Sequence, residues 1–262
     1  MPEAQLKDIT LNYREDGDPN GAPLVFINSL GTDLSLWDPL LPLLPAGLRI
    51  IRYDKRGHGN SEVAEPPYSM GTLVRDCEQL LDLLNVRDAM VVGLSIGGMI
   101  AQGLAVKRLD QVRALVLSNT AAKIGQPAMW QDRMELARHQ GMAPLVEPTM
   151  ERWFTKSFRS TPTVDHWRQK LLHTPVNGFV GCCAAIAGTD FYTPTSGLRL
   201  PTLGIAGSDD GSTPADLVRE TTDLIPGSQF KLIRRAGHIP CVEQPTAYAE
   251  ALTAFLRDTG HI

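Results

Sequence analysis

The fold of this chain is decided by one stretch, Val91-Val92-Gly93-Leu94-Ser95-Ile96-Gly97-Gly98-Met99. An apolar run with the length of a buried strand, Met90 to Val92, leads into it, and a helix-compatible segment follows from Ile96 to about Arg108. The residues between them match Gly-x-Ser-x-Gly, the pattern of a strand that turns at once into a helix. Because such a turn strains the backbone at its apex, the neighbouring residues must be small, which explains the glycines around Ser95.

The same turn gives Ser95 a chemical role. It holds the serine hydroxyl above the sheet, where a substrate can reach it. The helix that begins at Ile96 offers unpaired backbone N–H groups to a negative charge that develops beside the serine. A glycine-rich turn with an incidental serine is the alternative, but the strand before the pattern and the helix after it favour a nucleophile.

The composition is that of an ordinary globular protein. Its 262 residues suffice for one substantial α/β core, and 43% are hydrophobic while 21% are charged. A formal net charge of -4 argues against a nucleic-acid partner, which usually selects a basic surface. Because no apolar run has the length of a membrane span and the first residues do not resemble a secretion signal, we expect no membrane partner.

The four cysteines indicate a reducing compartment. Cys77, Cys182, Cys183 and Cys241 have the spacing of neither a zinc site nor a disulfide framework. Adjacent cysteines are also poor disulfide partners for each other. We therefore expect a cytoplasmic protein with reduced thiols and no metal site.

Predicted strands and helices alternate along most of the chain. Besides the run before Ser95, strands are predicted at Leu6–Arg14, Leu24–Asn28, Leu48–Tyr53, Ala114–Asn119, Thr202–Ala206 and Gln229–Ile233. Helical spacing of apolar residues extends from Ser69 to about Leu84, around Ala215–Leu224 and from Pro245 to Arg257. This alternation predicts an α/β fold with a mostly parallel central sheet, covered by helices on both faces.

The alternation breaks between about Thr120 and Thr195. This segment contains three of the four tryptophans, Trp130, Trp153 and Trp167, and its pattern is typical of several amphipathic helices. We interpret residues 120–195 as a helical cap over the carboxyl edge of the sheet. The cap is inserted into a core domain formed by residues 1–119 and 196–262. Trp153 and Trp167 are expected in the interior of the cap rather than in a pocket.

Three side chains suited to nucleophilic catalysis follow the ends of predicted strands. Ser95, Asp210 and His238 lie where functional groups gather in open parallel sheets. A serine hydroxyl needs an adjacent base, which His238 can supply, and a carboxylate can hold the imidazole in its working tautomer. Their order along the chain, serine, aspartate and then histidine, is that of the α/β-hydrolases.

The chain resembles the α/β-hydrolase superfamily along its whole length. Four superfamily motifs occur in order: the Asp-x-Arg-Gly-His-Gly-x-Ser turn at Asp54–Ser61, the elbow at Ser95, the Gly-x-x-Asp loop that begins at Gly207 and the Gly-His loop at Gly237. Four motifs in this order are far more specific than any one of them. The resemblance implies an α/β-hydrolase fold with a helical cap.

The resemblance also implies roles for single residues. Counting from the strand-end glycine indicates Asp210 as the acid of a catalytic triad, with its neighbour Asp209 as the alternative. Two backbone N–H groups would form the oxyanion hole, one of Ile96, which follows the nucleophile, and one of Leu30. His58 is expected to organise the backbone rather than to catalyse. Neither a metal nor an organic cofactor is implied.

Within the superfamily, the chain resembles the 3-oxoadipate enol-lactonases. The resemblance is carried by residues 28–33, 36–37, 119–125, Trp130, Arg133, 152–155 and 237–239. It implies opening of a five-membered enol lactone that carries an acetate arm, in aromatic-acid catabolism. The carboxylate of that substrate calls for a fixed cation beside an apolar wall, and Arg133 and Trp130 are the candidates. The alternative for Arg133 is a solvated surface residue.

The triad by itself leaves the reaction open. Another small-ester hydrolase, or a cofactor-free haloperoxidase or perhydrolase, could use the same scaffold and the same residues. A receptor that binds a ligand without rapid turnover could also keep them, since a fold does not dictate a function. The expected partner is a small molecule, and an anionic lactone is the preferred one.

Overall fold

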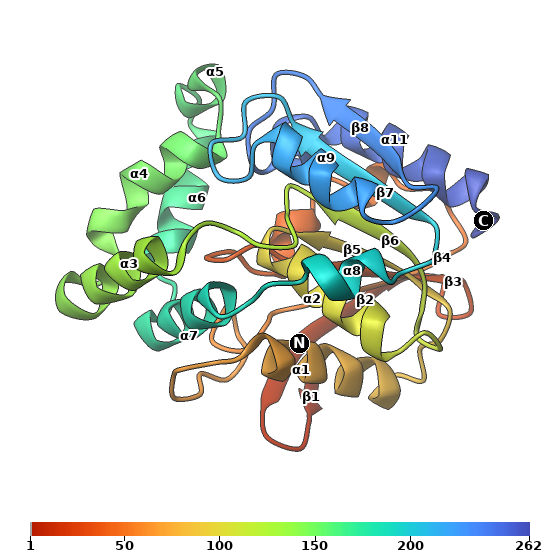
Figure 1. Cartoon of the computed structure of the whole chain (residues 1–262), viewed down its shortest axis with the longest axis horizontal. Coiled ribbons are helices and arrows are strands. Elements are labelled where there is room, and N and C mark those ends of the chain that lie inside the picture. Colours follow the sequence, from red (N-terminus) through yellow and green to blue (C-terminus); the bar gives the residue numbers. More distant parts are fainter. Residues whose placement is uncertain (1) are drawn as a thin grey trace.

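A computed structural model describes residues 2–262, which form an eight-stranded sheet flanked by helices (Figure 1). The strands are β1 (Glu3–Gln5), β2 (Thr10–Gly17), β3 (Ala22–Ile27), β4 (Leu48–Tyr53), β5 (Ala89–Leu94), β6 (Val112–Ser118), β7 (Thr202–Gly207) and β8 (Gln229–Ile233). Their order across the sheet is β1-β2-β4-β3-β5-β6-β7-β8. β1 and β2 pair antiparallel, as do β2 and β4, whereas β3 to β8 run parallel. The predicted α/β architecture is therefore confirmed.

Helices cover the sheet on both faces (Figure 1). One face carries α1 (Met70–Leu83), α2 (Ile96–Lys107) and α9 (Ala215–Asp223), and the other carries α11 (Pro245–Asp258), near the short elements η1 (Leu34–Trp37), η2 (Leu41–Leu43) and α10 (Pro240–Glu243). Every residue of β5 is buried, as expected for a central parallel strand covered on both sides. The loops after β3, β5, β7 and β8 consequently leave the sheet at the same edge.

The long connection from β6 to β7 forms a group of helices beside that edge (Figure 1). They are α3 (Pro127–Gln140), α4 (Ala143–Trp153), α5 (Lys156–Arg159), α6 (Thr163–Leu172), α7 (Val176–Ala187) and α8 (Tyr192–Ser196). α3 packs against α7, and α4 packs against α6, whereas α8 lies against the core helix α2. We propose that residues 120–195 form the cap, with its last helix resting on the core.

The beginning of the chain differs from the prediction. The sequence pattern predicts one strand over Leu6–Arg14, whereas the structure contains two strands, β1 and β2. Lys7 and Asp8 are exposed in the turn between them, which the Leu6 N–H closes by donating to the Ile9 carbonyl oxygen at 2.9 Å. Alternating polarity does not reveal this reversal, because a hairpin and a single strand share the same period. The other predicted strands and helices agree with the structure to within a residue or two at each end.

Three further findings concern the residues that the structure describes. The four cysteines are free and buried. No helix within residues 2–262 has the length and apolarity needed to cross a membrane. In the same part of the chain, no group of three or more His, Cys, Asp or Glu side chains is arranged to hold a metal ion.

The cap touches the core through two glycines. Gly57 belongs to the turn at residues 54–61, and Gly178 lies in α7. A Cβ added to Gly178 would lie 1.9 Å from the Gly57 carbonyl oxygen. Gly57 also has a φ of 73°, which residues with a side chain rarely adopt. The backbone of α7 therefore rests directly on the backbone of a core loop.

Gly178→Ala is expected to lower the free energy of unfolding by about 1–3 kcal/mol, because the added methyl group must push two backbones apart. Urea denaturation at neutral pH measures the change. Gly188→Ala, at the end of the same helix, is the matched control, since a Cβ there meets only the Ala184 carbonyl oxygen at 3.5 Å. Equal stability of the two variants would contradict the direct contact between cap and core.

Candidate active site

Ser95 occupies a strained turn between β5 and α2. Its φ of 59° and ψ of −121° lie outside the regions that residues with a side chain prefer. A Cβ on Gly97 would lie 2.1 Å from the Ile27 carbonyl oxygen, and one on Gly93 would lie 2.3 Å from the carbonyl oxygen of Gly97. Both glycines are thus needed for the close approach of strand and helix, and the turn has the tight geometry that its sequence predicts.

His238 and Asp210 meet beyond the ends of β8 and β7. His238 Nδ1 lies 2.9 Å from Asp210 Oδ2 and 3.0 Å from Oδ1, and both residues are buried. Because a carboxylate only accepts, this contact favours a proton on Nδ1 and leaves Nε2 as the ring nitrogen that can accept a proton. Asp209 is exposed, and its carboxylate instead accepts a hydrogen bond from Ser208 Oγ at 2.6 Å. Of the two candidate acids, the structure brings Asp210 to the histidine.

The Asp210 carboxylate accepts several further hydrogen bonds. Asn119 Nδ2 and Thr213 Oγ1 each lie 2.8 Å from Oδ2, and the Ser212 N–H donates to Oδ1 at 2.7 Å. Burial alone raises the pKa of Asp210, but His238 and these donors outweigh it and hold the pKa below its ordinary value of 3.8. The stability that this carboxylate contributes is therefore present above pH 3.8 and is lost as the pH falls through the lowered pKa.

The loop that carries His238 is attached to the cap. The His238 N–H donates to the Trp153 carbonyl oxygen at 2.8 Å, and the Gly237 N–H donates to Glu243 Oε2 at 2.8 Å. Glu243 Oε1 also accepts the Thr155 N–H at 3.0 Å. The position of the imidazole is consequently fixed by the end of α4 and by α10, as well as by the strand before it.

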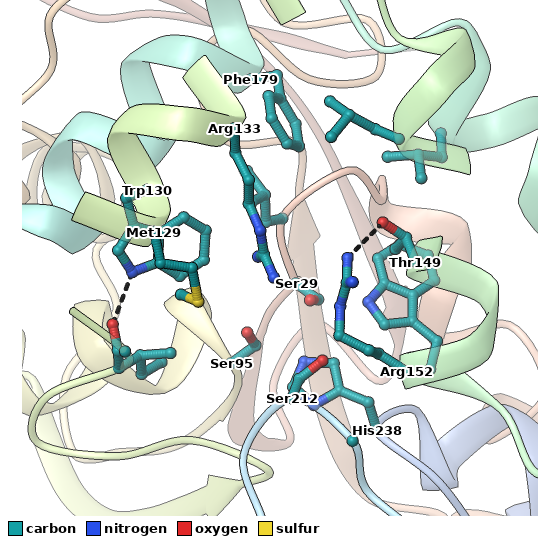
Figure 2. A pocket seen from close by; sticks show the side chains of 17 residues that line it. Ser29, Ser95, Met129, Trp130, Arg133, Thr149, Arg152, Phe179, Ser212 and His238 are labelled. Carbon is teal, nitrogen blue, oxygen red and sulfur yellow. Dashed lines mark hydrogen bonds between the residues drawn. The ribbon is translucent and has the colours of Figure 1, made fainter. Parts of the chain in front are cut away.

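A cavity of ≈ 180 Å³ lies between these groups and the cap (Figure 2). Ser95, His238, Ser29 and Leu30 line it from the core. Side chains of α3 and α4 line it from the cap; they include Met129, Trp130, Arg133, Thr149 and Arg152. The serine hydroxyl and the imidazole therefore open into the same small space, together with cationic and apolar side chains.

Two arginines of the cap point into this cavity, Arg133 from α3 and Arg152 from α4 (Figure 2). Arg133 stacks on Trp130, with Cζ 4.8 Å from the ring centroid, and Arg152 donates to Thr149 Oγ1 at 3.0 Å. Neither arginine forms an ion pair with any of residues 2–262. The cavity thus carries two positively charged groups without an ion-pair partner among the residues that the structure describes.

The surroundings of these two arginines lower the pKa of both guanidinium groups, but both groups keep their positive charge. Burial lowers the pKa of Arg133 below its ordinary value. Burial and repulsion from Arg133 lower the pKa of Arg152 to about 10. Both guanidinium groups therefore stay protonated at neutral pH, and an anion that enters the cavity would relieve the repulsion between them. This arrangement favours a negatively charged ligand.

Two backbone N–H groups are available for an oxyanion. Leu30 lies in the loop after β3 and lines the cavity, and Ile96 is the first residue of α2. Within residues 2–262, neither N–H donates a hydrogen bond. Since buried N–H groups are usually paired, two free ones beside Ser95 are suited to a charge that forms only during a reaction.

The sequence reveals part of this cavity. Trp130 and Arg133, the two residues that the resemblance implies for substrate binding, both line it. The expectation for Trp153 is wrong, because this side chain also lines the cavity, whereas Trp167 packs against Phe154. Arg152 belongs to the stretch 152–155 that carries the resemblance, but no binding role is predicted for it, although its spacing of three residues from Thr149 on a helix places both on one face.

A profile described as the alpha/beta hydrolase fold matches residues 22–245, and the chain belongs to the α/β-hydrolase family. It is similar to 3-oxoadipate enol-lactonase 2 of Acinetobacter baylyi, with 34% identity over 253 residues, which cover 96% of this chain and 94% of the relative. The crystal structure of the enol-lactonase from Burkholderia xenovorans LB400 superposes with a TM-score of 0.94 at 35% identity, covering 98% of this chain and 100% of that chain. The non-heme chloroperoxidase CPO-A1 of Kitasatospora aureofaciens is 26% identical over 256 residues, covering 91% of this chain and 92% of the relative. The expected resemblance to the superfamily and to enol-lactonases is confirmed.

Proposed function

We propose that this protein is a serine hydrolase that opens 3-oxoadipate enol-lactone to 3-oxoadipate. The observation that carries the proposal is the pair of unneutralised arginines, Arg133 and Arg152, in the cavity that Ser95 and His238 line. Guanidinium groups match the geometry of a carboxylate, and Trp130 offers an apolar wall beside them. The cavity thus suits a small lactone with one carboxylate. The names of two similar proteins, both enol-lactonases, support this choice.

In the proposed reaction, Ser95 attacks the carbonyl carbon of the lactone. His238 Nε2 removes the hydroxyl proton as the bond from Oγ to that carbon forms, and Asp210 stabilises the resulting imidazolium. The negative charge on the carbonyl oxygen is held by the N–H groups of Leu30 and Ile96. These roles are the ones that the described geometry is suited to fill.

Collapse of this tetrahedral intermediate opens the ring. The bond between the acyl carbon and the ring oxygen breaks, and the oxygen leaves as an enolate. Protonation by His238 gives the enol, which tautomerises to the ketone of 3-oxoadipate. Because an enolate is a good leaving group, this step makes modest demands on the acid. Water then gives a proton to His238 and adds to the acyl carbon, which forms a second tetrahedral intermediate. Collapse of this intermediate breaks the bond to Ser95 Oγ, which takes the proton from His238. The acid is released, and the serine recovers its proton.

We further propose that the enzyme works in the cytoplasm, in aromatic-acid catabolism. Its four buried, free cysteines fit a reducing compartment. The proposed partner is the small anionic lactone.

Two other functions, one enzymatic and one non-enzymatic, are the alternatives to the lactonase. A chloroperoxidase among the similar proteins favours a haloperoxidase or perhydrolase, or another small-ester hydrolase, as the enzymatic alternative. A ligand-binding receptor on the same fold is the non-enzymatic alternative. The two arginines favour the lactone over a neutral ester, since an uncharged acyl group would leave both half-buried charges without an ion-pair partner.

The wild-type protein tests the proposal directly. We expect kcat/KM for 3-oxoadipate enol-lactone to exceed that for p-nitrophenyl acetate by about 100-fold or more, since a bound carboxylate adds charge-assisted hydrogen bonds. Ultraviolet absorbance of the enol lactone and release of nitrophenolate measure the two rates. A higher kcat/KM for the neutral ester, or halogenation with peroxide and acetate in place of lactone opening, would overturn the choice of substrate.

Arg133→Met is expected to raise KM for the lactone by about 10- to 100-fold, because one charge-assisted contact with the carboxylate is lost. KM for p-nitrophenyl acetate should change by less than about twofold, since that ester has no carboxylate to bind. Arg219→Met is the matched control, because Arg219 also stacks on an aromatic ring, that of Phe230 at 4.3 Å, but is exposed outside the cavity. Equal effects of Arg133→Met on both substrates would remove Arg133 from carboxylate binding.

A further inference from the structure

A buried lysine lies beneath the loop that carries Leu30. Lys55 is 2% exposed, and its Nζ donates to the Ser29 carbonyl oxygen at 2.6 Å. A longer contact of 3.4 Å reaches the Thr32 carbonyl oxygen. Within residues 2–262, Lys55 forms no ion pair, so its charge is held mainly by backbone carbonyl groups. Burying an ammonium group without an ion-pair partner lowers the free energy of unfolding. A lysine kept in such a place is therefore a candidate for a functional role.

The carbonyl group that Lys55 contacts shares a peptide unit with the Leu30 N–H. The Ser29–Leu30 peptide is trans, so its C=O and N–H bonds point in opposite directions. Lys55 binds the oxygen from the interior, and the N–H is therefore directed away from the lysine. Both Ser29 and Leu30 line the cavity. A cation at the carbonyl oxygen draws electron density from the amide and makes its N–H a stronger donor.

Two more contacts hold this loop in place. Thr32 Oγ1 donates to the same Ser29 carbonyl oxygen at 2.9 Å. The next peptide is held by the Gly31 N–H, which donates to His58 Nε2 at 3.0 Å. Burial, together with the charge of Lys55, keeps the pKa of His58 well below 6.5, so its ring is neutral and Nε2 can accept. His58 thus holds the backbone of this loop, the kind of role expected of it from its sequence motif.

We propose that Lys55 is a positioning residue whose charge orients and polarises the Ser29–Leu30 peptide, so that the Leu30 N–H binds the oxyanion of the transition state more strongly. This inference rests on the proposed function, because it needs Ser95 chemistry to act upon. Removal of a whole oxyanion-hole donor costs about 100- to 1,000-fold in kcat in other hydrolases. Loss of the polarising charge alone should have a smaller effect, about 10- to 100-fold.

The charged form of Lys55 is also sensitive to pH. Burial lowers the pKa of Lys55 from 10.5 to about 8, against the attraction of Asp54 and Asp33. The other groups that face it do not titrate between pH 7 and 10, since burial keeps the pKa of His58 well below this range and raises that of Cys182 to about 12. Folding therefore bears the cost of the charge at neutral pH, and this cost fades as the pH rises from about 8 to 10.5.

The test uses p-nitrophenyl acetate, whose neutral acyl group makes no demand on the cap arginines. In Lys55→Met we expect kcat to fall by about 10- to 100-fold, with KM within about twofold and a melting temperature no lower than that of the wild type. The background-corrected kcat of the wild type should decline as the pH rises through about 8, and Lys55→Met should lack this decline. Lys107→Met, which removes an exposed lysine paired with Glu78, is the matched control and should keep wild-type values.

Two outcomes would overturn the inference. One is a wild-type kcat in Lys55→Met, and the other is a wild-type kcat that stays constant between pH 7 and 10. The second measurement needs no variant, so it remains decisive if Lys55→Met does not fold. Ser95→Ala is measured in parallel. If Ser95→Ala keeps turning over the ester, the proposed function fails; if it is inactive while Lys55→Met retains full kcat, only the role of Lys55 fails.

Discussion

Ser95→Ala is expected to lower kcat for both the enol lactone and p-nitrophenyl acetate by about 10⁴- to 10⁶-fold. The methyl group cannot form the bond to the acyl carbon, so only the cavity, the two N–H groups and the imidazole remain to assist water. The variant should fold, because the strained φ of 59° at this position is held by close contacts of Gly93 and Gly97 rather than by the hydroxyl. Steady-state assays and circular dichroism measure both properties.

Rapid-mixing experiments sharpen this prediction. The wild type should release a burst of nitrophenolate equal to the enzyme concentration if deacylation is the slower step, and mass spectrometry should then find the acetyl group on Ser95. Ser196→Ala, at an exposed serine of α8, is the control and should retain full activity. Substantial turnover by Ser95→Ala would exclude the serine mechanism. Binding of the lactone by a wild-type protein that turns over neither substrate would favour the receptor function.

Asp210→Asn is expected to lower kcat by about 10⁴-fold with little change in KM. An amide in this position can offer its NH₂ group to His238 Nδ1, which moves the ring proton to Nε2 and removes the base for Ser95. The amide also cannot stabilise an imidazolium by charge. Since Asn119, Ser212 and Thr213 all donate to the carboxylate, at least one of these donors loses an acceptor in the variant.

Asp209→Asn is the matched control, one residue away. Asp209 is exposed and accepts from Ser208, so this variant should keep kcat within about twofold of the wild type. Urea denaturation of both variants separates lost catalysis from lost stability. A larger loss of kcat in Asp209→Asn than in Asp210→Asn would reverse the assignment of the acid.

Much of the scaffold could be predicted because its signals are local. The predicted strand Leu48–Tyr53 matches β4 in the structure, since a buried strand is a short, largely apolar run between turn residues. The predicted strand Gln229–Ile233 matches β8, although β8 lies at the edge of the sheet and is mostly exposed. The elbow around Ser95 is equally local, because its glycines are required by contacts within a few residues and with the adjacent strand. The hairpin of β1 and β2 could not be predicted in this way, because the chain reversal at Lys7 and Asp8 does not interrupt the alternation of apolar and polar residues.

The cavity depends on contacts between distant segments. Arg152 and Trp153 face Ser95 because the end of α4 is bonded to the loop of His238, and no sequence spacing encodes that meeting. The side chain of Lys55 is a similar case. A lysine in a polar turn is usually solvated, but here the loop after β3 and helix α7 enclose it.

By itself, the sequence determined the parallel part of the sheet and the turn that exposes Ser95, because each follows from residue type and spacing within a short window. It also fixed the order of Ser95, Asp210 and His238 along the chain. Only the tertiary structure decided which of Asp210 and Asp209 contacts the histidine. It also directed the side chains of Arg133 and Arg152 toward the same cavity. Finally, it buried the charge of Lys55 behind Leu30. The physical reason is that burial and electrostatic pairing are set by neighbours in space, and for these side chains the neighbours come from remote parts of the chain.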